Sequence, residues 1–258
     1  MEKTVFAADA FAGKTVLISG GTSGIGLAAA ETFLRAGACV MIMGRDEKRG
    51  NHALAALSAE ERVRFFAGDV RSPSDCRKAV DATVRICGVL DVLVNSAGIY
   101  MEGAAETLSA EDLDEMIDTN LKGTIYLTQA AMPHLRRAHG NIVNVASDAG
   151  LRGNYFCAAY AATKGAIIAF TRSLARETAH EHLRVNAVAP ADVLTPLTER
   201  QLSPHVPHAE QLRQMADIYP MGRIGRPEEA AAVIVFLASS AASWITGSIY
   251  TVDGGLLA

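Results

Sequence analysis

A tyrosine, a lysine and a serine have the residue types and the spacing that acid–base chemistry needs. Tyr160 and Lys164 lie four residues apart, and Ser147 precedes the tyrosine by thirteen residues. On a helix, a four-residue spacing brings two side chains onto one face. A free tyrosine titrates near pH ~10, and a neighbouring ammonium group favours the phenolate, which lowers the tyrosine pKa toward neutral pH. The pair therefore predicts a proton donor or acceptor, and it also fits an amphipathic helix without chemistry.

The residues around this pair predict a helix, and those before the serine predict a strand. Residues 158–176 are rich in alanine and contain no proline, and their one glycine, Gly165, is tolerable in a helix. Residues 141–146 form an apolar, β-branched run, with Ser147 at its carboxyl end. We therefore expect a strand end to present the serine and a helix to present the tyrosine and the lysine.

A glycine-rich turn follows the first predicted strand, residues 15–19. It contains Gly20, Gly24 and Gly26, and a helical stretch continues to about Arg35, where Gly37 ends it. A strand, a glycine turn and a helix together aim backbone N–H groups at a phosphate. The spacing G-x-x-x-G-x-G differs from the G-x-G-x-x-G of the standard dinucleotide fingerprint. By itself, the turn fits either phosphate binding or an ordinary tight turn.

Strands and helices alternate along the whole chain. Further strands are predicted at residues 39–43, 63–67, 90–95, 184–189 and 248–252, and further helices at 47–58, from 72, from 109 toward Pro133, and from 226. This alternation predicts a parallel sheet with helices on both faces. In such folds ligands bind outside the carboxyl ends of the strands. The glycine turn, Arg45, Asp69, Asn95 and Ser147 all fall at these ends.

Composition narrows the classes of function. The 258 residues, half of them apolar, suit one large α/β domain. The net charge of −4 and the lack of a basic block argue against nucleic-acid binding. The longest strictly apolar run, residues 230–238, has about half the length of a membrane span, and residues 1–13 lack a signal-peptide layout. Four scattered cysteines predict free thiols. We therefore expect a soluble, cytoplasmic protein that does not act at a membrane.

With these residues placed, the sequence resembles a short-chain dehydrogenase/reductase from about Lys14 to the C-terminus. The family motifs occur in order: SGGTSGIG at 19–26, GDV at 68–70, NSAG at 95–98, Asn120, Ser147, Tyr160-x-x-x-Lys164 and VDGG at 252–255. The resemblance implies a single doubly wound Rossmann domain over residues 1–258, with a central parallel sheet of about seven strands and helices on both faces. It also implies an oxidoreductase that transfers a hydride between a nicotinamide cofactor and a small or medium secondary alcohol or ketone.

The resemblance assigns catalytic roles to four residues. Tyr160 is implied as the general acid in carbonyl reduction and as the base in alcohol oxidation. Lys164 is implied to lower the tyrosine pKa and to hydrogen-bond the nicotinamide ribose, and Ser147 to stabilise the substrate oxygen. Asn120 is implied to mark a helix irregularity that holds a water linking Lys164 to solvent. By itself, Asn120 also fits an ordinary surface amide.

The resemblance further implies a cofactor site that prefers NADP(H), with NAD(H) possible. Gly44 stands where NAD-selective folds carry an acidic residue, and the Arg45 guanidinium that follows matches a phosphate in charge and geometry. Asp46 is expected to face the next helix. Ala191 replaces a glycine that is usual in the family. The implied cofactor-binding set is Gly20, Thr22, Ser23, Ile25, Gly26, Arg45, Asp69, Val70, Asn95, Gly98, Tyr160, Lys164, Val193 and Thr195.

Two other functions remain open. A 3-oxoacyl reductase acting on an acyl carrier protein or on CoA needs a basic surface, for which Arg136, Arg137 and Arg172 are candidates. A non-catalytic cofactor-binding scaffold has no need of all four catalytic residues. The substrate pocket is expected from residues 99–101, 148–156 and 192–219, with Leu151, Tyr155, Phe156 and Met101 as apolar members.

Three further expectations concern residues outside the catalytic set. His205 and His208 lie in a loop-like segment without an obvious third ligand, so no metal site is predicted. Trp244 is expected in core or interface packing. The resemblance implies a homotetramer that uses the C-terminal strand and the helix after Pro227, and the apolar C-terminus fits such burial.

Overall fold

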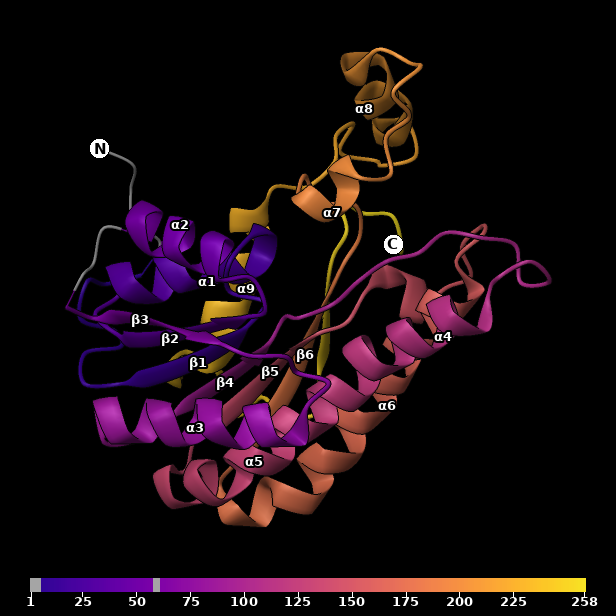
Figure 1. Ribbon diagram of the computed structural model, residues 1–258. Coiled ribbons are helices and arrows are strands. Elements are labelled where there is room, and N and C mark those ends of the chain that lie inside the picture. Colours follow the sequence, from indigo (N-terminus) through magenta and orange to yellow (C-terminus); the bar gives the residue numbers. More distant parts are fainter. Residues whose placement is uncertain (1–5, 58–60) are drawn as a thin grey trace.

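The computed structural model describes residues 6–57 and 61–258, and within these ranges seven strands form one parallel sheet (Figure 1). Their order is β3-β2-β1-β4-β5-β6-β7. The chain adds β2 and β3 on one side of β1 and then β4 to β7 on the other side, so the order of connection reverses between β1 and β4. In open α/β sheets, ligands bind at this reversal. The predicted doubly wound fold is confirmed. The strands are β1 (Thr15–Ser19), β2 (Cys39–Gly44), β3 (Val63–Ala67), β4 (Val92–Asn95), β5 (Asn141–Val145), β6 (Arg184–Pro190) and β7 (Ile249–Val252).

Helices cover both faces of the sheet (Figure 1). On one face lie α1 (Gly24–Arg35), α2 (Glu47–Leu57) and α9 (Pro227–Ala238), and on the other α3 (Pro73–Cys87), α5 (Gly123–Ala138) and α6 (Ala158–Thr178). Successive strand residues point to opposite faces, so Val16 and Ile18 pack with Phe33 of α1 while Leu17 packs with Leu127 of α5. Each such burial contributes roughly 1.5–3 kcal/mol. These two cores hold the carboxyl edge of the sheet in place.

Local sequence signals set several helix ends. Ser72 Oγ accepts a hydrogen bond from the Asp75 amide at 3.2 Å, and Pro73 takes the first helical position of α3. After α1 ends, Gly37 adopts φ 95°, which glycine accepts without strain. Both helix-end predictions are confirmed. Ser58, the last residue of the helix predicted at 47–58, lies outside the described residues.

A wide helical turn separates two helices that the sequence predicts as one region. After α4 (Ala110–Met116), a π-helical turn, η1 (Ile117–Lys122), leads into α5. A π-turn adds a residue to a helix and is frequent at functional sites. The region extends beyond Pro133 to Ala138. The irregularity expected around Asn120 is therefore confirmed. Single 3₁₀ turns occur at η2 (Asp148–Gly150), η3 (Ala179–Glu181) and η4 (Ser240–Ala242).

Two helices that were not predicted, α7 (Pro196–Glu199) and α8 (His208–Ala216), lie above the sheet at the top of Figure 1. Thr195 caps α7, with its Oγ1 accepting from the Thr198 amide at 3.4 Å. The loop predicted at His208 is wrong, because this residue begins α8 and its Nε2 lies 2.9 Å from a Glu199 carboxylate oxygen. Trp244 is 99% exposed, so of the two expected settings core packing is wrong, and packing at an interface stays a prediction.

The described helices were also compared with the length and apolarity that a lipid bilayer requires. Among them, none is long and apolar enough to cross a membrane.

Candidate active site

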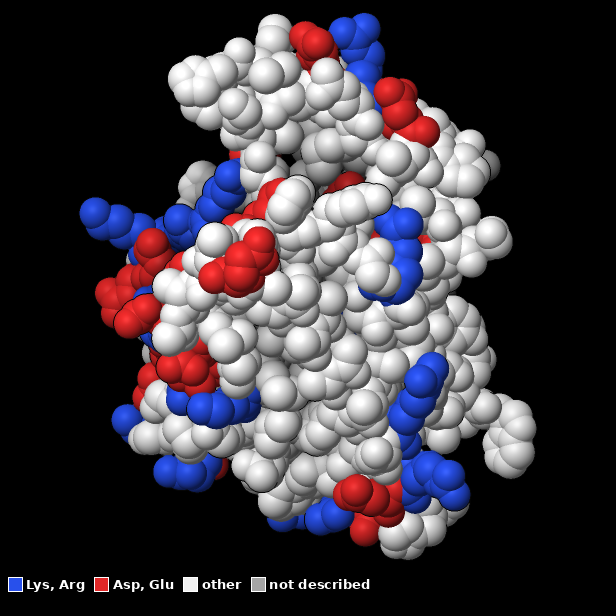
Figure 2. Space-filling view, turned by 90° about the vertical axis from the view of Figure 1, so that its right-hand side faces the viewer, with Lys and Arg blue, Asp and Glu red and all other residues white. Residues whose placement is uncertain are grey.

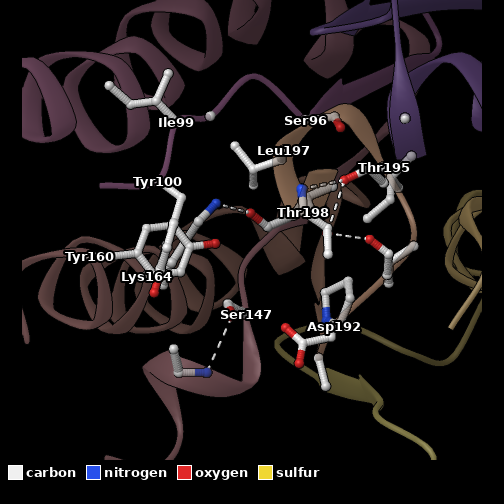
Figure 3. Close-up of a pocket in the computed structure, with 18 of the residues that line it drawn as sticks. Ser96, Ile99, Tyr100, Ser147, Tyr160, Lys164, Asp192, Thr195, Leu197 and Thr198 are labelled. Atoms are coloured by element: carbon white, nitrogen blue, oxygen red, sulfur yellow. Dashed lines mark hydrogen bonds between the residues drawn. The ribbon is translucent and has the colours of Figure 1, made fainter. Parts of the chain in front are cut away.

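A cavity of about 240 Å³ lies at the carboxyl ends of β1, β4, β5 and β6, with α7 along one side (Figure 3). It gathers predicted residues from segments far apart in the chain. Those that line it are Gly20, Thr22, Ser23, Ile25, Gly98, Ser147, Tyr160, Lys164, Val193 and Thr195. Gly24, Ser96, Leu197, Thr198 and Gln201 also line it. Most of the predicted site residues therefore share one chamber.

Tyr160 and Lys164 lie one turn apart on α6 and both face this cavity (Figure 3). Lys164 Nζ lies 5.7 Å from the centre of the Tyr160 ring and donates a hydrogen bond to the Val145 carbonyl oxygen at 2.8 Å. The lysine is 5% exposed, and this burial lowers its pKa to about 8. Lys164 is thus a fixed cation whose charge is sensitive to pH near neutrality.

The surroundings of Tyr160 hold its pKa above the ordinary value of a tyrosine. Burial raises this pKa, the Ser147 hydroxyl partly opposes the shift, and the charges of Asp148 and Asp192 raise it further. The expected lowering of the pKa is therefore wrong for this structure, because burial outweighs any stabilisation of the phenolate. The Tyr100 ring packs edge-on against Tyr160, with centroids 4.9 Å apart. In this setting the tyrosine is a proton donor at neutral pH.

Ser147 stands at the carboxyl end of β5, where the chain enters η2. Its Oγ donates to Asp148 Oδ1 at 2.9 Å and accepts from the Ala149 amide at 3.2 Å. The Asp148 carboxylate is buried, and its Oδ2 lies 3.5 Å from Arg152 Nε. To stabilise a substrate oxygen that gains negative charge, this hydroxyl must turn its one proton from Asp148 toward the cavity.

Asn120 lies in η1 and is 1% exposed, so it is not a surface amide. Its Oδ1 accepts from the Ile99 amide at 2.8 Å, and its Nδ2 donates to the Ile99 carbonyl oxygen at 2.9 Å. The same Nδ2 reaches Thr163 Oγ1 at 3.2 Å. A Cβ added at Gly98 would lie 3.3 Å from Asn120 Oδ1 and 3.5 Å from Lys164 Nζ. Asn120 therefore holds the cavity wall next to Lys164 and does not itself line the cavity.

The glycine turn leaves an uncapped helix end at the cavity. Within the described chain, the Ser23 side chain makes no capping hydrogen bond at the start of α1, and the first turn holds no acidic residue. Gly20 adopts φ 67°, and a Cβ there would lie 2.8 Å from Ala97 Cα. Gly26 packs directly on the Gly20 carbonyl oxygen. Free N–H groups at such a helix N-terminus fit a phosphate, which is the group that the resemblance implies here.

Arg45 lines a second cavity, next to the first, together with Met101 and Glu115. Its Nη1 lies 3.9 Å from both Asp69 Oδ2 and Glu115 Oε1, so neither carboxylate holds it tightly. The Asp69 carboxylate is instead bound by Arg71, at 2.7 Å and 2.9 Å. Arg71 is a second guanidinium that the sequence reasoning missed, although it directly follows the GDV motif.

The end of β2 is the place where the sequence predicted a preference between NADP(H) and NAD(H). A Cβ at Gly44 would lie 2.9 Å from Thr22 Cγ2, so an acidic side chain has no room there. The Asp46 carboxylate accepts from the Arg49 amide at 3.0 Å, at the start of α2. The expectation that Asp46 faces the following helix is confirmed.

Two predicted cofactor residues have their side chains inside the protein. Val70 is 7% exposed and packs in the core against Gly123. Asn95 Nδ2 donates to Asn144 Oδ1 at 2.8 Å and to Thr128 Oγ1 at 3.0 Å. These bonds hold the Asn95 amide nitrogen against neighbouring elements, whereas its buried Oδ1 has no hydrogen-bond partner within the described residues. The expected positions of Asn95 beside the cofactor and of Val70 at its adenine stay predictions, and with these side chains buried such contacts would use backbone groups.

The predicted substrate segments contribute unequally to the main cavity. Ile99, Tyr100, Asp148, Asn154 and Asp192 line it. Three other predicted members, Leu151, Tyr155 and Phe156, are exposed, with Tyr155 at 89%. Phe156 adopts φ 53°, a left-handed conformation that is uncommon for a bulky residue. Met101 belongs to the second cavity.

Cysteine and metal chemistry were considered over the whole described chain. In residues 6–57 and 61–258, no group of three or more His, Cys, Asp and Glu side chains is placed to hold a metal. The four cysteines carry free thiols, and burial raises the pKa of Cys76 to about 12. Such a thiol is unreactive at neutral pH.

Comparison with known proteins agrees with this geometry. Residues 20–257 match the sequence model of the family described as enoyl-(acyl carrier protein) reductase. The L-fucose dehydrogenase of Bos taurus is 37% identical over 95% of this chain and 90% of its own length. The 3-oxoacyl-(acyl-carrier-protein) reductase FabG of Thermotoga maritima is 38% identical over 95% of this chain and 98% of its own length.

A solved structure shows the same fold. The short-chain dehydrogenase/reductase of Brucella melitensis, described as a glucose/ribitol dehydrogenase, superposes with a TM-score of 0.91 at 36% identity, covering 98% of this chain and 100% of its own. The chain therefore belongs to the short-chain dehydrogenase/reductase family. It is an NAD(P)-dependent dehydrogenase or reductase that acts on a small-molecule substrate.

Proposed function

We propose that this protein is an NADP(H)-dependent oxidoreductase that interconverts a small or medium secondary alcohol and its ketone. The cofactor site and the catalytic residues lie in one domain over residues 1–258. The observation that supports this most directly is that Tyr160, Lys164 and Ser147 meet in one cavity beside the uncapped start of α1.

The nicotinamide, when bound, supplies or accepts the hydride. In reduction, Tyr160 donates its phenolic proton to the carbonyl oxygen, and in oxidation it accepts the hydroxyl proton. The raised pKa keeps this proton available for reduction at neutral pH, whereas oxidation requires the deprotonated phenolate and is therefore favoured at higher pH. Ser147 donates a hydrogen bond to the same substrate oxygen. The Lys164 ammonium lies beside the phenol and stabilises negative charge as the proton leaves.

Three observations support NADP(H) over NAD(H). Gly44 excludes an acidic side chain at the end of β2, Asp46 is occupied at the start of α2, and Arg45 is only loosely paired. A weakly held guanidinium can turn to a 2′-phosphate and bind it bidentately. Asp69 remains paired with Arg71, so it does not compete strongly for Arg45.

A 3-oxoacyl reductase is a second candidate, because the Thermotoga maritima relative carries that description and matches over nearly the full chain. One assay addresses both candidates. Nicotinamide absorbance is followed with NADPH or NADP⁺ across a panel of ketones, alcohols and acetoacetyl-CoA. We expect turnover of simple ketones and alcohols that Tyr160→Phe abolishes. Reduction confined to acetoacetyl-CoA would transfer the proposal to the second candidate.

We also propose that the protein is a cytoplasmic homotetramer. Within the described sheet β7 is an edge strand that pairs only with β6, and the exposed Trp244 precedes it. Figure 2 shows the side that carries α4 and α6, and the middle of this face is largely free of charged side chains. Such a surface suits burial between subunits. Light scattering should return four times the 27.2 kDa chain mass, and a monomer mass at micromolar concentration would oppose the proposal.

A further inference from the structure

Two acidic side chains, Asp148 and Asp192, line the same cavity as Tyr160, and Asp192 is labelled in Figure 3. Asp148 begins η2 after β5, and Asp192 follows the end of β6. The charge of each acts on the tyrosine, and the charge of Asp148 also acts on Asp192. The three side chains therefore share one cavity and interact electrostatically.

The Asp192 carboxylate is held rigidly by a tyrosine from the segment after α8. Tyr219 Oη donates to Asp192 Oδ2 at 2.7 Å and accepts from the Asp192 amide at 3.1 Å. Tyr219 is itself buried. The other carboxylate oxygen, Oδ1, has no hydrogen-bond partner in the described residues, and Figure 3 shows this carboxylate directed toward Ser147. One fixed acceptor atom of Asp192 is thus open to a ligand.

Asp148 contributes a second acceptor, whose charge is already partly compensated. Its two oxygens contact Ser147 Oγ at 2.9 Å and Arg152 Nε at 3.5 Å. Two compensated carboxylates suit neutral hydrogen-bond donors better than a free cation. An ionised carboxylate only accepts hydrogen bonds, so a ligand group beside it must be a donor such as a hydroxyl. Asn154 and Gln201 add neutral polar groups to the same lining.

These observations also discriminate against two substrate types. A methylene next to Asp192 Oδ1 would leave a partly buried carboxylate oxygen unsatisfied, which disfavours plain alkyl alcohols. An anionic substrate would meet two like charges, which disfavours carboxylate-bearing or phosphate-bearing molecules at this end of the cavity.

We propose that the substrate is a neutral polyhydroxylated alcohol, or the corresponding ketone, with a free hydroxyl next to the reacting carbon. Asp192 Oδ1 accepts a hydrogen bond from that hydroxyl, and Asp148 supports recognition of a further one. This inference rests on the proposed oxidoreductase function, because it assigns the chemistry of the substrate at the same site.

The test compares rings that differ only in the number of hydroxyl groups. Oxidation of cyclohexanol, cyclohexane-1,2-diol and inositol is followed with NADP⁺, together with a set of aldoses. We expect kcat/KM for the diol to exceed that for cyclohexanol by about 10- to 100-fold, because a site built for a hydroxyl rejects an analogue lacking it. A cyclohexanol value equal to that of the diol would overturn the proposal.

Substitutions test whether Asp192 causes the preference for the diol over cyclohexanol. In Asp192→Asn, the diol-to-cyclohexanol ratio of kcat/KM should fall about tenfold, because a charged acceptor becomes a neutral one. Tyr219→Phe removes the hydroxyl that holds the carboxylate and should lower the ratio as well, which gives a second reading if Asp192→Asn folds poorly. Asp217→Asn, an exposed acid on the same segment, should leave the ratio unchanged. A ratio that is unchanged in folded Asp192→Asn and Tyr219→Phe would overturn the assignment.

Two results separate failure of this inference from failure of the proposed function. If acetoacetyl-CoA is reduced more efficiently than every hydroxyketone is, the polyol inference is wrong while the oxidoreductase function stands. If no alcohol or ketone reacts with either cofactor, the proposed function itself is wrong, and the inference falls with it.

Discussion

Lys164 Nζ donates to the Val145 carbonyl oxygen at 2.8 Å, so the last residue of β5 fixes the position of an ammonium group on α6. Ser147 stands only two residues beyond Val145. Strand β5 therefore positions Ser147 because the serine directly follows it in the chain, and it positions Lys164 through the hydrogen bond to Val145. Tyr160 lies one turn before Lys164 on the same helix.

Tyr160→Phe should lower kcat by at least about 100-fold, because general acid–base steps are worth ~10²–10⁴-fold. Cofactor affinity should change little, since the ring remains and only the hydroxyl is lost. Stopped-flow turnover and cofactor titration by fluorescence measure the two effects. Tyr155→Phe is the matched control, because that tyrosine is exposed and outside the cavity. A Tyr160→Phe enzyme with more than about a tenth of the wild-type rate would exclude the acid–base role.

Ketone reduction should lose activity as the pH rises through about 8. Burial lowers the pKa of Lys164 to about 8 and raises that of Tyr160, so the lysine loses its proton first. The charged ammonium is fully present below this pH and disappears above it. The measurement is kcat/KM for a ketone from about pH 6 to about pH 10 at saturating cofactor. A profile that stays flat to about pH 10 would contradict this reading of Lys164.

Arg45→Ala should reduce the preference for NADP(H) by about 10-fold or more, because a charge-assisted phosphate contact is lost. The kcat/KM for NAD(H) should change little. Arg49→Ala is a suitable control, since Arg49 is an exposed cation nearby on α2. Arg45 would not be the residue that binds the 2′-phosphate if the wild-type enzyme prefers NAD(H). The same conclusion would follow if Arg45→Ala leaves the cofactor preference unaltered.

Glu229→Gln should lower the free energy of unfolding by roughly 1 kcal/mol at neutral pH, the usual effect of losing a helix cap. The Glu229 carboxylate binds the Arg223 guanidinium at 2.6 Å and 2.8 Å and accepts from the Arg226 amide at 2.8 Å. The bonds from Arg223, opposed by burial and aided by the Arg226 amide, lower the Glu229 pKa to about 2.

A carboxyl group with a depressed pKa contributes its full stabilisation when the pH is above the pKa that the group has in the unfolded chain. For Glu229 this stabilisation is lost as the pH falls from 4.5 to about 2. The difference in the free energy of unfolding between wild type and Glu229→Gln should therefore become smaller at acidic pH. Urea denaturation at fixed protein concentration, near pH 7 and near pH 3, measures it. Glu228→Gln, an exposed neighbour in the same first turn, serves as control. A difference that is equal at both pH values would rule out the linkage.

The sequence predicted the elements and their order well, because the signals are local. The Ser72-Pro73 helix start and the Gly37 helix end depend on a few adjacent residues, and the structure has both. Tyr160 and Lys164 came together because a helix with a regular period carries them. The Thr195-Pro196 pair is an equally local signal for the start of α7 and could have been used.

Side-chain directions were harder to predict, since they depend on partners far away in the chain. Asn95 turns inward because Asn144 and Thr128 lie beside it. The raised pKa of Tyr160 depends on burial and on the charges of Asp148 and Asp192. These causes arise from the folded arrangement, and no short sequence motif around the tyrosine indicates them. Arg71 meets Asp69 in a pairing that only the folded chain shows.

The extra residue in η1 has a consequence for how the chain length can change. An α-helix turns by about 100° per residue, so the wide turn at Ile117–Lys122 offsets the faces of α4 and α5 by that amount. Deleting one residue there would restore regular helical bonding and still rotate Asn120 away from Ile99. The number of residues in this segment therefore matters for the position of Asn120 as much as the identity of Asn120 does. The stretch at 203–206, between α7 and α8, lies outside any helix, so a change in its length rotates no helical face.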